Sequence, residues 1–301
     1  MKVGFVGLGK MGLNMALNLI DDKWDIIGFD VNEKVRKFAI EKKVKVQNSL
    51  KDLLARLESR KIIFISLPSG EITNHLVDEL SLNLNDGDIV IDSGNSNYHD
   101  SVKNYKKLKQ KGISFLDCGT SGGIEGARYG ACLMIGGDKP TFNIMEPFFK
   151  SLACESGYIY AGEAGAGHYL KMVHNGIEYG MMQAIGEGFD ILQASEYKFD
   201  NEAVAEVWNH GSVIRSWLME LLVKSFTLDP KLEKIKGKVN ASGEAEWTIE
   251  EALKLGVPVP IISNSLFVRN ASQIEDSFTN KVVSTLRQGF GGHKTFEKDG
   301  K

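Results

Sequence analysis

The first half of the chain alternates short apolar runs with amphipathic stretches. The apolar runs, rich in β-branched residues, lie at residues 3–6, 25–29, 62–67, 89–91 and 113–116. The stretches between them have the periodicity of helices with one apolar face, most clearly at residues 11–20, 71–80 and 101–111. Alternation of this kind predicts a parallel sheet with helices on both faces, which is the doubly wound α/β class.

The second half of the chain carries a different pattern. Strand signals stop after Tyr160, and residues 164–194 can form one helix, which at ~1.5 Å per residue would be about 45 Å long. Further helical patterns follow at residues 202–209, 212–226, 248–255 and 261–285, with a glycine-rich tail at 289–293. We therefore predict an α/β domain over residues 1–163 and an all-helical domain over residues 164–301.

The composition is that of an ordinary globular protein. Its 301 residues carry 36 Lys and Arg against 39 Asp and Glu, a formal net charge of −3. This balance offers no basic surface for nucleic acid or anionic lipid. No apolar run approaches the roughly 20 residues of a membrane span, and the opening strand leaves no room for a signal peptide. We expect a cytoplasmic protein whose cysteines, Cys118, Cys132 and Cys154, are reduced thiols.

A glycine-rich turn joins the first predicted strand to the first predicted helix. Its six residues are Gly7, Leu8, Gly9, Lys10, Met11 and Gly12. Glycines in a GxGxxG turn let a pyrophosphate rest against the amides that open the helix, and Asp30 at the end of the second strand supplies the expected acidic partner. A plain turn would also use glycines, but the strand, the helix and the acid together favour a dinucleotide-binding Rossmann domain.

The acidic residue bears on the choice of cofactor. Asp30 would accept hydrogen bonds from the adenosine ribose and repel a 2′-phosphate, which favours NAD over NADP, although Arg36 could soften the preference. The alternative role of Asp30 is to cap the following helix. Leu67, Pro68 and Asn95 follow later strands, at the sheet edge where open α/β folds bind ligands, so we include them with the cofactor-binding residues; ordinary turn chemistry is the alternative.

Four polar side chains recur on one face of the long predicted helix. They are Lys171, His174, Asn175 and Glu178, at positions i, i+3, i+4 and i+7. The residues between them are apolar, so the stripe places a base, an imidazole, an amide and a carboxylic acid on the wall of a cleft. The alternative is a solvent-exposed helix face with no catalytic role. Four such polar groups next to a cofactor-binding domain make this alternative the weaker one.

Three segments, residues 92–98, 119–130 and 167–180, contain recognisable motifs, which continue in order through residues 247–248, 255–258, Arg269, Arg287 and 290–293. Together they resemble the signature motifs of decarboxylating 6-phosphogluconate dehydrogenases, in the short form of the family. The likeness therefore covers nearly the whole chain. The resemblance implies oxidative decarboxylation of 6-phosphogluconate to ribulose 5-phosphate and CO2 in the pentose phosphate pathway, with NAD preferred and NADP possible.

The resemblance also implies a role for each matching residue. Lys171, neutral in a buried site, would take the proton of the substrate 3-hydroxyl, and Glu178 would protonate C1 after decarboxylation. The remaining residues would bind the substrate: Asn95, His174 and Asn175 its hydroxyls and carboxylate, Ser121, Gly122 and Gly123 its carboxylate, and Tyr179, Thr248, Arg269, Arg287 and His293 its phosphate. The sequence offers no cluster of metal-ligand spacing, so we expect no metal.

One residue departs from the family pattern. Before Trp247 the family usually has a basic residue that helps to bind phosphate, and this chain has Glu246. Either a neighbouring lysine such as Lys238 compensates, or the substrate differs in its distal group.

Two other functions stay open from the sequence. A dehydrogenase of 3-hydroxy acids such as 3-hydroxyisobutyrate would share the glycine turn, residues 121–123 and the helix lysine, but would not need Glu178 or Arg287. A catalytically silent dinucleotide-binding scaffold would have no use for Lys171. We expect a homodimer or homotetramer, in which the C-terminal tail completes the site of a partner subunit.

Overall fold

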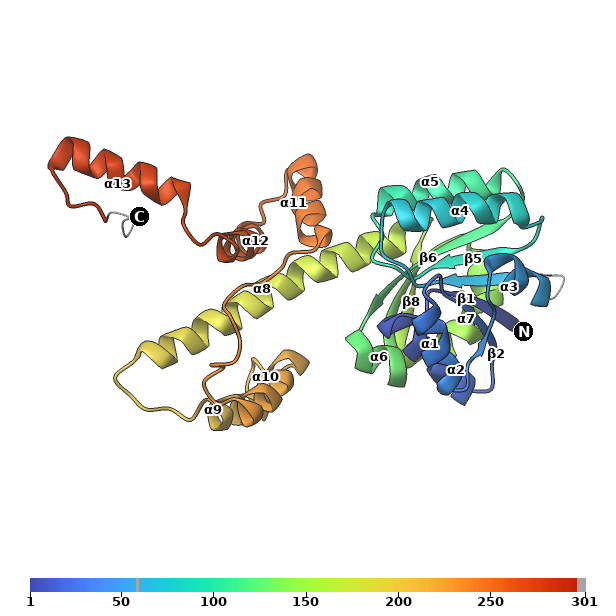
Figure 1. The fold of residues 1–301 in the computed structure, drawn as a ribbon, viewed down its shortest axis with the longest axis horizontal. Helices are drawn as coiled ribbons and strands as arrows, with labels where there is room; N and C mark the ends of the chain where they lie inside the picture. The colour runs from blue at the N-terminus through green and yellow to red at the C-terminus, as the bar shows by residue number, and fades with distance from the viewer. Residues whose placement is uncertain (58–59, 297–301) are drawn as a thin grey trace. The chain divides into compact units, whose positions relative to one another are not determined.

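The computed structural model describes residues 1–57 and 60–296 of the chain. Contacts divide the chain into two compact units, with the division after Asn175. The long helix α8 (Ala166–Ala194) begins close to the predicted boundary at residues 163–164 and runs through this division (Figure 1).

The first unit is built on one eight-stranded sheet. Its strands are β1 (Lys2–Val6), β2 (Asp25–Phe29), β3 (Lys45–Val46), β4 (Ile62–Ile65), β5 (Ile89–Asp92), β6 (Ser114–Ser121), β7 (Ala131–Gly137) and β8 (Ala153–Gly162). The strand order is β3-β2-β1-β4-β5-β6-β7-β8, and every neighbouring pair is parallel except β6 and β7. The predicted Rossmann fold is confirmed. The strand prediction missed β3, β7 and β8, and with them the antiparallel pair.

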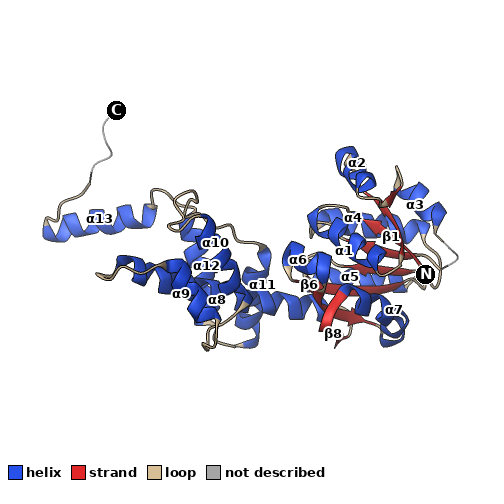
Figure 2. Ribbon diagram, turned by 90° about the horizontal axis from the view of Figure 1, so that it is seen from below, coloured by secondary structure: helices blue, strands red, loops and turns tan. Residues whose placement is uncertain are grey.

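Helices cover both faces of this sheet (Figure 2). They are α1 (Lys10–Asp21), α2 (Glu33–Glu41), α3 (Leu50–Arg56), α4 (Glu71–Asn83), α5 (Tyr98–Lys109), α6 (Gly123–Tyr129) and α7 (Lys139–Leu152). Alternate residues of β4 point to opposite faces, so Phe64 packs in a core with α1 and α7, whereas Ile63 packs in a second core with α3, α4 and α5. Both side chains are fully buried. Burial on two faces explains why these strands are continuously apolar in sequence.

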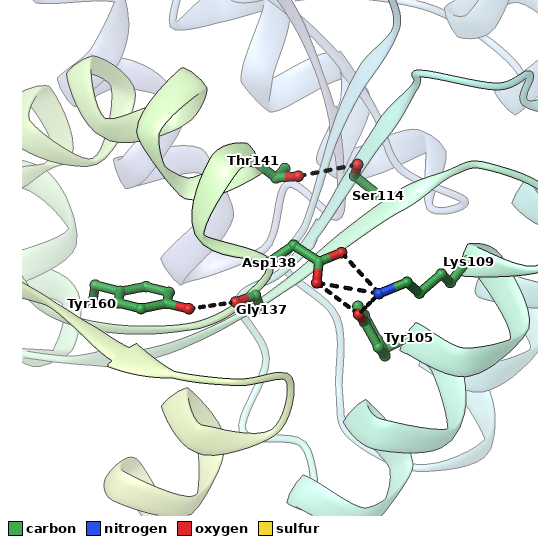
Figure 3. A network of polar contacts seen from close by, with 7 residues as sticks. All are labelled: Tyr105, Lys109, Ser114, Gly137, Asp138, Thr141 and Tyr160. Carbon is green, nitrogen blue, oxygen red and sulfur yellow. Dashed lines mark hydrogen bonds and ion pairs between the residues drawn. The ribbon is translucent and has the colours of Figure 1, made fainter.

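A polar network joins α5 to the β7–α7 turn of the same unit (Figure 3). The Tyr105 hydroxyl donates to Asp138 Oδ1 at 2.7 Å, and Lys109 contacts both residues. Burial raises the pKa of the Tyr105 hydroxyl, and the hydrogen bond to Tyr105, followed by that to Asp138, raises the pKa of Lys109. Nearby, the Tyr160 hydroxyl donates to the carbonyl of Gly137 at 2.9 Å. These bonds tie α5, β7 and β8 together on the side of the sheet that ends in β8.

The second unit contains the rest of α8 and the helices that follow. These are α9 (Asn201–Asn209), α10 (Trp217–Leu228), α11 (Gly243–Leu255), α12 (Pro260–Ser272) and α13 (Phe278–Gly291). Phe189 of α8 packs with α9 and α10, and Tyr179 of α8 packs with α11 and α12. Helix α13 buries none of its residues. An all-helical second half is as predicted, and no described helix is long and apolar enough to cross a membrane.

Some helix bounds of this unit differ from the prediction. The single helix expected over residues 261–285 is wrong, because α12 ends at Ser272 and α13 begins at Phe278. The Ser277 hydroxyl accepts a hydrogen bond from the amide of Asn280, so a new N-cap starts the second helix. Residues 289–291, predicted as a tail, form the last turn of α13.

Candidate active site

The carboxyl ends of β1 to β6 meet at one edge of the sheet, since these strands are all parallel. The glycine turn follows β1 at this edge. Gly7 has a φ of +95°, and a Cβ on it would lie 2.3 Å from the carbonyl oxygen of Ser66. A Cβ on Gly12 would lie 2.1 Å from the carbonyl oxygen of Gly7. The tight turn therefore admits only glycine at both positions.

Gly9 differs from the other two glycines of the turn. Its φ is −64°, and a Cβ there would meet nothing within 4 Å. The protein's own packing thus gives no reason for glycine at this position. Gly9 caps α1 without a side-chain hydrogen bond, which leaves open the space in front of the first amides of the helix. A dinucleotide pyrophosphate fits this cradle, because anions bind favourably at helix N-termini.

Asp30 fastens the glycine turn to the end of β2. Its Oδ2 accepts a hydrogen bond from the amide of Leu8 at 2.8 Å, and its Oδ1 accepts one from the amide of Asn32 at 2.8 Å. The alternative role as a helix cap is wrong, because Asn32 caps α2 by accepting from the amide of Lys34. The Arg36 guanidinium donates to the carbonyl of Asp30 at 2.7 Å, so a cation lies at the same strand end.

The ends of β4 and β5 present the other predicted cofactor residues. Leu67 is half-buried and Pro68 is exposed just after β4. Beyond β5, the buried Asp92 accepts from the amide of Gly94 at 3.0 Å and from the Ser96 hydroxyl at 2.7 Å. These bonds hold a tight loop from which Asn95 projects as an exposed side chain.

A chain of hydrogen bonds links three of the four stripe residues to the end of β6. Lys171, only 6% exposed, donates from Nζ to Asn175 Oδ1 at 2.7 Å. His174 Nδ1 lies 3.0 Å from the same oxygen, and its Nε2 lies 3.2 Å from the Ser121 hydroxyl. Because Asn175 Oδ1 can only accept, Nδ1 is the donor to it, and in the neutral imidazole the Ser121 hydroxyl then donates to Nε2. Lys171, His174, Asn175 and Ser121 therefore form one group.

The two glycines after Ser121 have backbones that favour glycine. Gly122 has a φ of +117° and Gly123 a φ of +58°. A Cβ on Gly122 would also lie 3.0 Å from the Cα of Gly126. The loop between β6 and α6 is thus a tight turn held by the fold, and the predicted carboxylate-binding residues 121–123 follow one another along it.

In the helical unit, three of the predicted phosphate-binding residues lie close to one face of α8. They are Tyr179 on the helix itself, Arg269 and Thr248. The Arg269 guanidinium carbon lies 3.4 Å from the centre of the Tyr179 ring, and its Nη1 donates to the carbonyl of Asn240 at 3.1 Å. The Tyr179 hydroxyl lies 3.0 Å from the Ser242 hydroxyl. Thr248 is buried, and its Cγ2 would meet a Cβ on Gly176 at 2.9 Å.

The remaining predicted residues are not brought into these groups by the described contacts. Glu178 is half-buried on α8, and Glu246 is exposed on α11. Arg287 and His293, on and after α13, are both exposed, and the His293 ring lies 6.2 Å from the ring of Phe290.

The sequence reasoning passed over two residues that organise these groups. Asp117, fully buried on β6, accepts hydrogen bonds from the backbone at the start of α8. Ser242 binds the Tyr179 hydroxyl through both its hydroxyl and its amide. No local pattern marks either residue, because their partners lie about 50 residues away or more in sequence.

Two family models match the chain, one after the other. The NAD binding domain of 6-phosphogluconate dehydrogenase matches residues 2–162, and the 6-phosphogluconate dehydrogenase C-terminal domain matches residues 167–299. The chain belongs to the 6-phosphogluconate dehydrogenase family. It is accordingly an oxidoreductase of a family that uses a nicotinamide dinucleotide.

Members of the 6-phosphogluconate dehydrogenase family match over the full length. YqeC of Bacillus subtilis, whose name assigns this activity only provisionally, is 49% identical over 99% of this chain and 100% of its own. An NAD-dependent, decarboxylating 6-phosphogluconate dehydrogenase of Haloferax volcanii is 38% identical over 99% of this chain and 100% of its own.

Solved structures agree with this family assignment. The 6-phosphogluconate dehydrogenase of Plasmodium falciparum, studied with NADP+ and with 6-phosphogluconate, superposes with a TM-score of 0.83 at 27% identity, covering 100% of this chain and 67% of its own. A 3-hydroxyisobutyrate dehydrogenase of Mycobacterium tuberculosis has a TM-score of 0.70 at 23% identity, covering 95% of this chain and 99% of its own, a likeness of fold alone.

Proposed function

We propose that this chain oxidises 6-phosphogluconate at C3 and releases C1 as CO2, giving ribulose 5-phosphate, with NAD as the preferred acceptor. The observation that carries the proposal is the hydrogen-bonded group of Lys171, Asn175, His174 and Ser121, in which Lys171 and Asn175 are buried. It lies at the carboxyl edge of the sheet that also carries the glycine turn. The Haloferax volcanii relative, which matches over its whole length, is named as an NAD-dependent, decarboxylating 6-phosphogluconate dehydrogenase.

The steps follow from the chemistry of the residues. A dinucleotide whose pyrophosphate is held at the glycine turn would supply the acceptor for the hydride from C3. Lys171 takes the proton of the 3-hydroxyl and then, as an ammonium, stabilises the enolate that forms as CO2 leaves the β-keto acid. Glu178 then delivers a proton to the enol carbon that was C2 of the substrate and becomes C1 of the pentulose. The hydroxyls and carboxylate of the substrate are bound by His174, Asn175, Ser121, Gly122, Gly123 and Asn95.

The preference for NAD rests on Asp30. Its carboxylate lies at the end of β2, where it repels a 2′-phosphate. Arg36 lies at the same strand end and binds the carbonyl of Asp30, so its charge moderates this repulsion without removing the carboxylate. We propose that NADP is accepted but used less efficiently.

Glu246 bears on how the distal end of the substrate is bound. Glu246 and Glu250 line a pocket of the helical unit together with Ser242. Lys238, the candidate for compensation, forms an ion pair with Glu275 at 2.7 Å. We therefore propose that the phosphate is bound by Arg269, Tyr179, Thr248, Arg287 and His293. Replacing Glu246 with lysine should lower the KM for 6-phosphogluconate; an unchanged KM would show that Glu246 does not face the phosphate.

We further propose that the enzyme is a homodimer or a homotetramer. Helix α13 exposes Phe278, Leu286 and Phe290 by 61–77%, although an isolated helix gains nothing from such an apolar face. A second copy of the chain would cover this face, and it would place Arg287 and His293 in the site of that copy.

A substrate panel tests the proposed function. The purified chain is assayed with NAD and 6-phosphogluconate, gluconate or 3-hydroxyisobutyrate, and NADH formation is followed. We expect the highest kcat/KM with 6-phosphogluconate. A higher value with gluconate would mean that the distal group is not a phosphate, and a higher value with 3-hydroxyisobutyrate would replace the proposal by the simpler dehydrogenase reaction.

A further inference from the structure

Strand β6 contacts the first turns of α8 at successive points along its length. Asp117, Gly119 and Ser121 are alternate residues of β6 and therefore point to one face of the sheet. Each of the three contacts α8, and the contacts advance along the helix as they advance along the strand. The strand thus acts as a template for the position of the helix that carries Lys171.

The first of these contacts is made by a buried carboxylate. Asp117 is 0% exposed, its Oδ1 accepts from the amide of Gly165 at 2.6 Å, and its Oδ2 accepts from the amide of His168 at 2.9 Å. The first amides of a helix have no partner within the helix, so they need an acceptor when they are buried. The acceptor here comes from a strand 48 residues earlier in the chain, so this bond fixes the helix to the sheet.

The second contact leaves no free space between strand and helix. A Cβ on Gly119 would lie 2.4 Å from the Cβ of Lys171, and a Cβ on Gly167 would lie 2.7 Å from the carbonyl oxygen of Asp117. The stem of Lys171 therefore rests directly on the backbone of β6. A shift of the helix along the strand would carry Lys171 and His174 away from Ser121.

We propose that Asp117 is a positioning residue for Lys171, which acts by fixing the start of α8 on β6 and does not itself touch substrate. The effect on turnover rests on the proposed function, whereas the effect on the helix does not. Displacements of about 1 Å can cost on the order of a hundredfold in rate, so loss of this anchor should be visible in kcat.

The test compares Asp117→Asn with the matched variant Asp88→Asn. Asp88 is likewise 0% exposed and accepts from two amides, those of Lys61 and Asn85, but it precedes β5 at the opposite edge of the sheet. In each variant the asparagine keeps one accepting oxygen but turns an N–H donor toward the other amide, so one of the two bonds is lost. Asp88→Asn also removes the ion pair between Lys61 Nζ and Asp88 Oδ2 at 3.9 Å, so the control is perturbed at least as much. We expect both to lower the Tm, but only Asp117→Asn to lower kcat, by tenfold or more, with the Kd for NAD within about twofold of that of the unmodified enzyme.

Hydrogen exchange supplies a readout that needs no substrate. In Asp117→Asn, the amides of residues 165–171 should exchange faster, while those of β1 and α1 keep their protection; Asp88→Asn should leave residues 165–171 unchanged. If the chain proves inactive on 6-phosphogluconate, this comparison still decides the positioning role. Asp117→Ser, which keeps one short acceptor, replaces the asparagine variant should that variant not fold.

Two results would overturn the proposal. One is a kcat in Asp117→Asn equal to that of the unmodified enzyme. The other is an equal loss of kcat in Asp88→Asn, which would mean that general destabilisation, and not the position of α8, limits turnover.

Discussion

Lys171 and Glu178 lie two turns apart on the same helix face, and the proposed reaction gives them different steps. Lys171→Met should abolish NAD reduction, because no other group at that position can take the hydroxyl proton. Glu178→Gln should still oxidise and decarboxylate the substrate but slow the final protonation. Stopped-flow NADH formation measures the first step, and solvent deuterium at C1 of the pentulose measures the last.

As a control, the affinity of each variant for NAD and for substrate is measured, and both ligands should still bind. Equal loss of hydride transfer in the two variants, with both ligands still bound, would show that the two residues do not divide the work in this way.

Asp30 determines the cofactor preference in this account. Asp30→Ala should narrow the ratio of kcat/KM for NAD to that for NADP, because the charge that opposes the 2′-phosphate is gone. It should also raise the KM for NAD, since the amide of Leu8 loses its acceptor. Asp25→Ala, at the other end of β2, is the matched control and should leave the ratio unchanged. A native preference for NADP would contradict the assignment.

The residues of the candidate site could be predicted where they follow one another at short, regular spacings in the sequence. The glycine turn and the stripe from Lys171 are visible because turn and helix spacings are short. Asp117 and Ser242 were missed because their roles depend on contacts between distant segments. The capping role considered for Asp30 failed because Asn32, two residues later, takes that place.

Among the helices and strands, periodicity predicted the buried parallel strands β1, β2, β4, β5 and β6 and most helices, but not β3, β7 and β8. Strand β3 has only two residues, too few to show a pattern. Strand β8 alternates poorly, because most of its residues are at least partly exposed at the sheet edge. The break between α12 and α13 depends on the single N-cap at Ser277, which apolar periodicity does not register.

The network between α5 and the β7–α7 turn should make stability fall at alkaline pH. The pKa values of Tyr105 and Lys109 are raised above their ordinary 10.0 and 10.5 in the folded chain. Both groups therefore hold protons that the unfolded chain releases, and their stabilisation is complete below about pH 10 and is lost as the pH rises through the folded pKa values. Urea unfolding at pH 8 and pH 11 should show this loss.

Tyr105→Phe removes the hydroxyl and should reduce the alkaline loss of stability, while lowering stability at pH 8 because Asp138 loses a donor. Tyr197→Phe, a change at a tyrosine that is 74% exposed, is the control. An alkaline loss of the same size in Tyr105→Phe would mean that other groups cause it.

At the scale of the whole molecule, the proposed exchange of C-terminal tails can be tested by mixing two inactive variants. If Arg287 serves the site of the partner subunit, a dimer of Lys171→Met with Arg287→Ala contains one intact site. Refolding an equal mixture should then restore roughly a quarter of the sites. If Arg287 serves its own chain, every mixed site carries a defect and no activity returns.

In the proposed reaction, oxidation and decarboxylation are coupled. The ratio of CO2 released to NADH formed when 6-phosphogluconate is turned over measures this coupling. We expect equal amounts of the two, with ribulose 5-phosphate as the remaining product. NADH formed without CO2 would contradict it, because the chain would then be a simple dehydrogenase that leaves the carboxylate in place.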